Sequence, residues 1–188
     1  MEALKLEATY YTYEDLLKME RGLERYELID GVIQAMASPK RWHQEIVGEI
    51  FGQLRDFLKG KKCKVYISPF DVRLNFDDED DIVVQPDVLV ICDLSKLVKD
   101  GQGCKGAPDI VVEVLSPSTS FMDRIVKFRK YEQAGVPEYW IVDSAQKSIT
   151  IYRLTNGEYK NKTVYTDAAV SQVLEGCVID LAEVFPEE

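Results

Sequence analysis

The sequence predicts an α/β fold with a mixed central sheet, and three observations predict it. The segment IVVEVL (residues 110–115) is apolar on both sides apart from Glu113, a pattern typical of a central strand covered on both faces. A helical segment that ends at Gly135 separates it from the strand EYWIVD (138–143), so strand, helix and strand predict a parallel crossover. The alternating segment 149–165 turns at an Asn-Gly pair and adds an antiparallel hairpin at the end of the sheet.

The first third of the chain predicts a helix, a hairpin and a second helix. Thr12 can cap a short helix that runs to Met19. The segment RYELIDGVIQAM (25–36) reads as two strands around the two-residue turn Asp30–Gly31. A long helix is expected over residues 38–60, because apolar residues recur there at every third or fourth position.

The middle of the chain predicts further strands. They are expected at about 63–69, 70–76 and 82–91, with the acidic turn DDEDD (77–81) between the last two. The Gly- and Lys-rich segment LSKLVKDGQGCKGA (94–107) is expected to leave the domain surface as a loop.

The chain has no repeat, low-complexity tract or linker, so we expect a single domain over residues 1–188. Its longest apolar stretches fall short of the roughly 20 residues that a membrane helix needs. The first residues carry acids and tyrosines where a secretory signal has a basic start and an apolar core. The expectation is a cytoplasmic protein with no membrane contact.

Cysteine spacing and charge restrict the classes of site. Four cysteines lie 29, 12 and 73 positions apart, so no CxxC pair offers zinc two ligands, and we expect four reduced, partly buried thiols: Cys63, Cys92, Cys104 and Cys177. The net charge of −10 has the wrong sign for a protein held to DNA by phosphate neutralisation alone. Much of that acidity lies in residues 77–81 and in the tail 183–188, which can be remote from a site.

Glu113 is the most informative residue, because an ionised carboxylate in a covered strand is costly unless a cation or hydrogen bonds compensate it. It shares one face of its strand with Val111 and Leu115. Asp87 follows Pro86 at the start of VLVI, another strand with few polar residues. Carboxylates on neighbouring strands can share a hard cation, and Mg²⁺ prefers one or two carboxylates plus waters and phosphate oxygens. The two acids therefore predict a magnesium site.

An ordered set of motifs spans residues 26–143: YELIDG, HQEIVGEI, SPFDVRL, QPDVLVI, GAPDIVVEVLSPST, DRIVKFRKY and GVPEYWIVD. With these motifs the sequence resembles the PD-(D/E)XK nuclease superfamily and, more closely, its Uma-two family of restriction endonucleases. The resemblance implies a restriction-endonuclease-like core that hydrolyses DNA phosphodiester bonds with Mg²⁺ or Mn²⁺. It also points to a homodimer, because cutting both strands of a duplex is simplest with two active sites that a twofold axis relates.

The resemblance implies that Asp87 and Glu113 hold the metal beside a catalytic lysine. The superfamily's lysine position, two after Glu113, is Leu115 here, and the matching cation is Lys127 on the following helix. Its role would be to stabilise charge on the phosphate or to orient the attacking water. Glu27 would be an accessory ligand or would position water.

The secondary candidates have open alternatives. Asp109 is as compatible with a turn or cap role as with metal contact. His43, the single histidine, contacts the substrate or is structural. Gln85 binds a water or fills a strand. Asp123, Lys127 and Tyr131 share one helix face, so Lys127 alternatively forms an exposed salt bridge with Asp123, and Tyr131 belongs to the core.

Three functions remain open at this level. The first is a metal-dependent DNA endonuclease. The second is a catalytically silent binding or regulatory protein with a nuclease fold, which the net charge of −10 favours and the retained acids and lysine oppose. The third is a nuclease that acts on RNA or on branched or single-stranded DNA, and no feature of the sequence separates these substrates.

Overall fold

The computed structural model describes residues 9–19, 25–75, 79–99, 101 and 103–185. Its centre is a six-stranded sheet in the order β11-β10-β9-β8-β6-β3. The neighbours β8 and β9 are parallel and the other pairs are antiparallel, so the sheet is mixed. The strands of this sheet are β3 (Lys64–Ile67), β6 (Val88–Ile91), β8 (Ile110–Val114), β9 (Glu138–Asp143), β10 (Ser148–Thr155) and β11 (Glu158–Tyr165).

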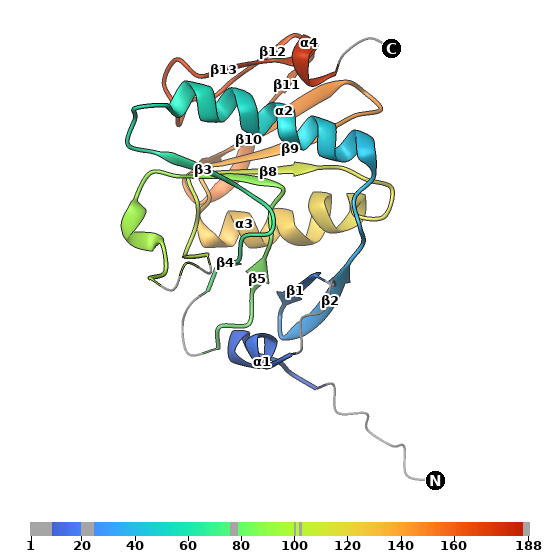
Figure 1. Ribbon diagram of the computed structural model, residues 1–188, viewed down its shortest axis with the longest axis vertical. Coiled ribbons are helices and arrows are strands. Elements are labelled where there is room, and N and C mark those ends of the chain that lie inside the picture. The colour runs from blue at the N-terminus through green and yellow to red at the C-terminus, as the bar shows by residue number, and fades with distance from the viewer. Residues whose placement is uncertain (1–8, 20–24, 76–78, 100, 102, 186–188) are drawn as a thin grey trace.

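Helices cover both faces of this sheet (Figure 1). The long helix α2 (Arg41–Leu58) packs its apolar stripe against the face that carries Val112 and Val114. The opposite face carries Val111 and lies against η2 (Met122–Lys127) and α3 (Phe128–Ala134). As expected, β8 is an interior strand that is apolar on both faces except at Glu113.

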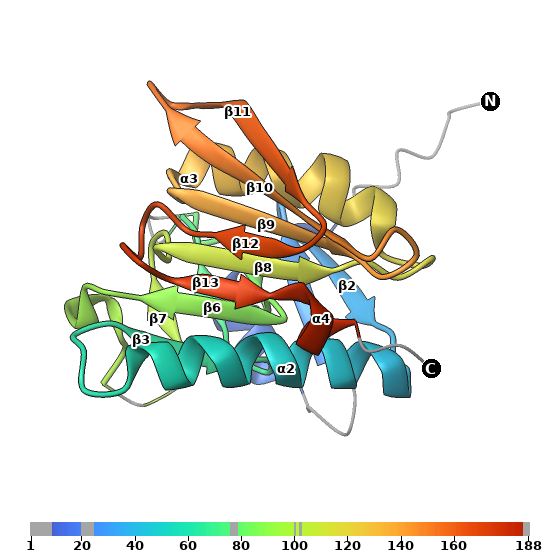
Figure 2. The same ribbon diagram turned by 90° about the horizontal axis from the view of Figure 1, so that it is seen from above.

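A smaller five-stranded sheet has the order β2-β1-β5-β4-β7 and lies beside α1 (Tyr13–Lys18), below the main sheet in Figure 1. The C-terminal segment forms a third sheet and a short helix, which the sequence did not predict and which pack on α2 (Figure 2). The bounds of these elements are β1 (Arg25–Ile29), β2 (Val32–Met36), β4 (Val72–Arg73), β5 (Val83–Val84), β7 (Cys104–Lys105), β12 (Ala168–Val170), β13 (Val178–Asp180) and α4 (Leu181–Val184).

Local signals place several elements as expected. Thr12 caps α1 through a capping box with Asp15. The β1–β2 hairpin turns at Asp30 and Gly31, whose φ values of 51° and 73° are the left-handed conformation that this turn requires. Gly135 ends α3 with φ of 84°.

Two expectations in the middle of the chain were wrong. The apolar run 82–91 is two strands in different sheets, β5 and β6, because Pro86 lies between them and cannot donate a ladder hydrogen bond. The segment 94–107 does not simply leave the surface. It contains the short helix η1 (Leu94–Lys96) and then β7, which pairs with β4 and places the Cys104 side chain in the core.

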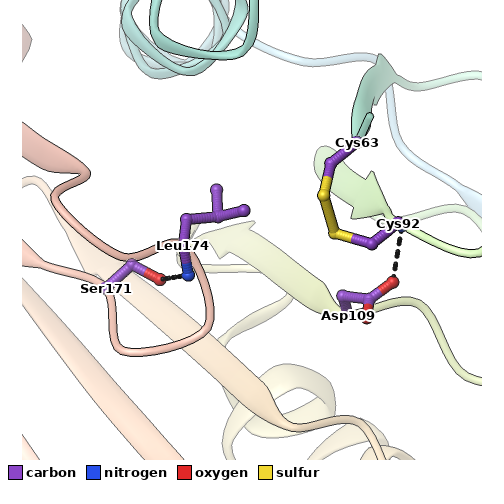
Figure 3. Close-up of a disulfide and its surroundings, with 5 residues drawn as sticks. All are labelled: Cys63, Cys92, Asp109, Ser171 and Leu174. Carbon is purple, nitrogen blue, oxygen red and sulfur yellow. Dashed lines mark hydrogen bonds between the residues drawn. A yellow bond between two sulfur atoms is a disulfide. The ribbon is translucent and has the colours of Figure 1, made fainter. Parts of the chain in front are cut away.

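The expectation of four reduced thiols was also wrong, because Cys63 and Cys92 form a disulfide (Figure 3). Lys64 pairs with Ile91 in the antiparallel β3–β6 register, so the residues just beyond this pair face each other across the two strands. A sequence separation of 29 residues does not reveal that register. Cys104 and Cys177 are free and buried, as expected, and burial raises the pKa of Cys177 to about 11.

Candidate active site

A pocket of about 490 Å³ opens between the small sheet, the main sheet and η2. Six of the predicted residues line it, and five of these are Glu27, Asp87, Glu113, Asp123 and Lys127. They come from β1, from the start of β6, from β8 and from η2, so the tertiary fold gathers groups that are up to 100 positions apart. The secondary candidate His43, at the start of α2, lines the same pocket.

Lys127 points to the acids and not to solvent. Its Nζ atom lies 2.7 Å from Glu27 Oε1, 3.1 Å from Glu113 Oε1 and 3.7 Å from Asp123 Oδ1. Burial opposes its charge, but the carboxylates of Glu113, Glu27 and Asp123 outweigh this effect and raise the pKa of Lys127 well above its usual value. The alternative of an exposed salt bridge with Asp123 is therefore wrong, since the side chain of Lys127 is only 5% exposed.

The helix that carries Lys127 has an unusual turn. Residues Met122–Lys127 form a π-helix, in which hydrogen bonds span five residues, and α3 continues it. π-Helical turns are rare in proteins, and those that occur are often found at functional sites. The wide turn rotates the faces of α3 relative to an uninterrupted α-helix, while Asp123 and Lys127 both face the interior. The sequence predicted an ordinary helix here.

Glu113 is held by two donors on the same oxygen. Tyr131 donates a hydrogen bond of 2.7 Å to Glu113 Oε1, which Lys127 also contacts. Burial raises the pKa of Glu113 well above its usual value, and the charge of Lys127 opposes that rise. Tyr131 is fully buried and belongs to the core, and through its hydroxyl it also fixes the orientation of the Glu113 carboxylate.

Asp87 is anchored to the neighbouring strand. Its Oδ2 accepts a hydrogen bond of 2.8 Å from the Val114 N–H and lies 3.2 Å from His43 Nε2. Its own N–H lies 3.4 Å from Glu113 Oε2. His43 Nε2 is also 3.1 Å from the Val114 carbonyl oxygen. Burial lowers the pKa of His43, but the hydrogen bond and charge of Asp87 outweigh this and raise it. His43 thus positions Asp87 from the wall of the pocket.

Asp123 is an additional buried acid of the pocket, with 2% of its surface exposed. Burial raises its pKa to about 6, against the opposing charge of Lys127 and a hydrogen bond from Thr119. The carboxylates of Asp87 and Glu27 face it and add to the rise. The ionised form of Asp123 therefore costs the folded state free energy at neutral pH.

We expect Asp123→Asn to stabilise the protein in a pH-dependent way. Because the folded-state pKa of about 6 exceeds the usual 3.8, the cost is present above pH 6 and disappears as the pH falls below 4. The gain at pH 8 should be on the order of 2–3 kcal/mol, at about 1.4 kcal/mol per pKa unit. Thermal melts at pH 8 and pH 4 measure it. Asp56→Asn, at an exposed site on α2, is the control, and an equal gain at both pH values would contradict this account of Asp123.

Two secondary candidates lie elsewhere. Asp109 begins the segment that leads into β8, at the opposite end from Glu113, and its carboxylate accepts the N–H of Cys92 at 2.7 Å beside the disulfide (Figure 3). There it accepts a backbone N–H just after the end of β6, away from the pocket. Gln85 does not line the pocket, but its N–H donates to Glu27 at 2.9 Å and its side chain donates to the buried Asp71 at 2.8 Å. Gln85 therefore holds the Glu27 carboxylate without lining the pocket itself.

Other residues that the sequence did not single out also line the pocket. Arg25 lies two positions before Glu27 on β1, and Trp42 lies next to His43. The alternation of a strand predicts that Arg25 faces the same side as Glu27, so this residue could have been found from Glu27. The position of Trp42 depends on how α2 is oriented, which only the tertiary fold shows.

The donor set fits Mg²⁺ better than it fits a metal ion whose ligands are all protein side chains. Within the described residues, no group of three or more His, Cys, Asp or Glu side chains is arranged to hold a metal ion. Asp87 and Glu113 are a two-carboxylate set that faces an open pocket. Proteins in general hold Mg²⁺ with one or two carboxylates, because this ion keeps several waters and takes further oxygens from substrate phosphates.

Comparison with known proteins identifies the family. The sequence profile of the Uma2 family, described as "Putative restriction endonuclease", matches residues 12–182. The chain belongs to the Uma2 family. Two curated proteins from Synechocystis sp. are similar to it. The protein slr1290 is 32% identical over 136 residues, which cover 71% of this chain and 68% of slr1290. The protein sll1609 is 28% identical over 131 residues, which cover 69% and 72%.

A solved structure supports the fold of this Uma2 chain. A crystal structure from Anabaena variabilis, described as "a putative nuclease belonging to DUF820", superposes with a TM-score of 0.74 and covers 93% of this chain and 97% of that one. With 18% sequence identity, the likeness establishes the restriction-endonuclease-like fold and not the activity. Among the described helices, none has the length and apolar character needed to cross a membrane.

Proposed function

We propose that this Uma2 protein is a metal-dependent endonuclease that hydrolyses DNA phosphodiester bonds. One observation carries the proposal: a buried, charged Lys127 is shared between carboxylates from β1 and β8 at the floor of an open pocket. Perturbed pKa values among groups that line a pocket favour a functional site. The family description points to the same reaction class.

Asp87 and Glu113 are the residues that would hold Mg²⁺ or Mn²⁺. When bound, the ion would polarise a phosphate oxygen and lower the pKa of an attacking water. The chain's own groups have separate roles. The ammonium of Lys127 offers positive charge to the phosphate as negative charge develops there. Tyr131 holds Glu113, and His43 and the Val114 N–H hold Asp87, so both carboxylates are oriented in advance.

Glu27 is placed to act beside the lysine. Its Oε1 accepts both Lys127 and the N–H of Gln85, which fixes the carboxylate in the pocket wall. From there it holds Lys127 in position or orients a water. The homodimer expected for cutting both strands of a duplex stays a prediction.

A catalytically silent binding protein is the second candidate, favoured by the net charge of −10. Against it, the pocket holds four carboxylates, Glu27, Asp87, Glu113 and Asp123, and the buried Lys127 pairs with all of them except Asp87. A protein released from catalysis could replace such a costly cluster with apolar side chains and gain stability.

The test is a cleavage screen with Asp87→Asn as the inactive reference. Duplex, single-stranded, branched and RNA substrates are incubated with Mg²⁺, Mn²⁺ or EDTA and resolved on denaturing gels. We expect cleavage that requires the metal and is lost in Asp87→Asn. Binding without any cleavage would support the silent protein, and cleavage that persists in EDTA would refute the metal site.

A further inference from the structure

The reacting groups lie at the bottom of the pocket, and this limits what can reach them. Glu113, Lys127 and Glu27 are 3%, 4% and 5% exposed. A phosphate must therefore enter the pocket to contact them. The backbone of a regular duplex is held by pairing and stacking on both of its strands, whereas an unpaired nucleotide can turn inward. This step and the following ones rest on the proposed nuclease function.

The pocket walls have the character of a base-binding site. One wall runs from the end of β2 to the first turn of α2 and includes Met36, Pro39 and Trp42. The other runs from the end of β8 to the start of η2 and includes Pro117 and Met122. The volume of about 490 Å³ is in the range that encloses a ligand of drug size, which is also the size class of a nucleotide. Apolar and aromatic walls above a charged floor suit a base above its phosphate.

Trp42 is the aromatic group of this wall. It is half-buried in the first turn of α2 and meets the His43 ring edge to face, with centroids 5.8 Å apart. His43 contacts Asp87, which is a proposed metal ligand. Trp42 is therefore the sequence neighbour of the residue that positions this ligand. Aromatic side chains bind unpaired bases by stacking, which tolerates any base sequence.

The charges argue against a duplex held along its backbone. Among the described residues that line the pocket, three are Lys or Arg (Arg25, Lys40 and Lys127) and four are Asp or Glu. The whole chain has a net charge of −10. Duplex binding depends on neutralising many phosphates at once, so this protein needs another source of affinity.

The geometry points to an unpaired nucleotide as the substrate unit, in single-stranded nucleic acid or at a branch or frayed end. Its base lies against Trp42 while its phosphate reaches Asp87, Glu113 and Lys127. The sequence left open which nucleic acid the protein cuts, and the pocket selects strands that can present a nucleotide without first breaking a base pair.

Binding is measured by fluorescence anisotropy with Lys127→Met in Mg²⁺, on one labelled sequence as single-stranded DNA, blunt duplex, branched duplex and single-stranded RNA. Denaturing gels check that each substrate stays intact. We expect the single strands and the branched duplex to bind about 10- to 100-fold more tightly than the blunt duplex, which must break a pair. Comparing single-stranded DNA with single-stranded RNA shows whether the sugar affects the binding affinity.

Trp42→Ala in the same background should weaken single-strand binding by about 5- to 150-fold, the range for loss of one stacked base. Trp42→Phe keeps an aromatic ring and should restore most of the affinity. Phe57→Ala, which truncates a half-buried aromatic at the other end of α2, is the matched control and should leave binding unchanged. Single strands should also quench the fluorescence that Trp42→Phe removes, a signature of stacking that a merely structural role does not give.

The outcomes separate this inference from the proposed nuclease function. If the wild-type protein cuts a blunt duplex as fast as single strands and Trp42→Ala changes neither binding nor cleavage, the inference is overturned and the nuclease stands. If single strands bind through Trp42 and no substrate is cut, recognition of an unpaired nucleotide stands and the nuclease function fails. Should Trp42→Ala not fold, Trp42→Phe and the quenching measurement decide the question.

Discussion

Replacing Lys127 with Met is expected to lower the cleavage rate by about 10²- to 10³-fold, or about 2.7–4 kcal/mol, the scale of losing one preorganised donor to developing charge. The structure places the Lys127 ammonium within 3.1 Å of Glu27 and Glu113 at the floor of the pocket, where the Lys127 side chain is only 5% exposed. A charge fixed in such a place acts more strongly than one in solvent. Single-turnover cleavage at saturating protein measures the effect on the chemical step.

The stability of Lys127→Met must be measured alongside its activity. Removing one partner of a buried ion pair can cost about 3–5 kcal/mol, because it leaves charge uncompensated. Glu113 can relieve part of this by binding a proton, since burial already raises its pKa. Thermal melts define a temperature at which the variant is folded, and rates are compared there.

Lys130→Met is the matched control, because Lys130 is on the same helix and pairs with the exposed Asp30. Its loss should cost at most about 1 kcal/mol of stability and leave cleavage nearly unchanged. Equal cleavage by folded Lys127→Met and by wild-type protein would remove Lys127 from the mechanism, and Lys127 would then be a structural partner of the acids.

Much of the fold follows from local patterns. The Asp30–Gly31 turn is set by the backbone conformations that these two residues accept, and β8 by apolar residues on both of its faces. The side of the sheet on which Glu113 lies follows from simple alternation. For the site, the buried Glu113 was identified from its cost alone, whereas the choice of Lys127 required the resemblance to a family, since nothing local distinguishes it from Lys130.

The remaining features depend on contacts between distant segments. Pro86 interrupts the apolar run 82–91, but nothing local shows that the two halves join different sheets. The Cys63–Cys92 disulfide depends on the register of β3 and β6. The approach of Trp42 to the acids depends on the direction in which α2 crosses the sheet. Hydrophobic periodicity determines which face of an element is buried, but it does not determine which other element covers that face.

Replacing Glu113 with Gln is expected to abolish measurable binding of Mg²⁺ or Mn²⁺ and, with it, cleavage. The amide keeps the size of the carboxylate and can still accept from Tyr131 and Lys127, so the fold should persist. The negative charge that a hard cation requires is lost. The decrease in metal affinity should exceed the roughly 10–100-fold that follows loss of an outer-shell partner. Isothermal titration with Mn²⁺ measures it.

Glu138→Gln provides the matched control for this experiment. Glu138 is another buried glutamate, 1% exposed, on the adjacent strand β9. Its carboxylate accepts hydrogen bonds from Trp140 and Ser171 and does not line the pocket. Its replacement should lower stability, because an amide cannot accept every bond that the carboxylate accepts, yet metal affinity should stay at the wild-type value. If Glu113→Gln binds Mn²⁺ as tightly as Glu138→Gln does, Glu113 is not a metal ligand, and Lys127 and Tyr131 are then the partners that compensate its buried carboxylate.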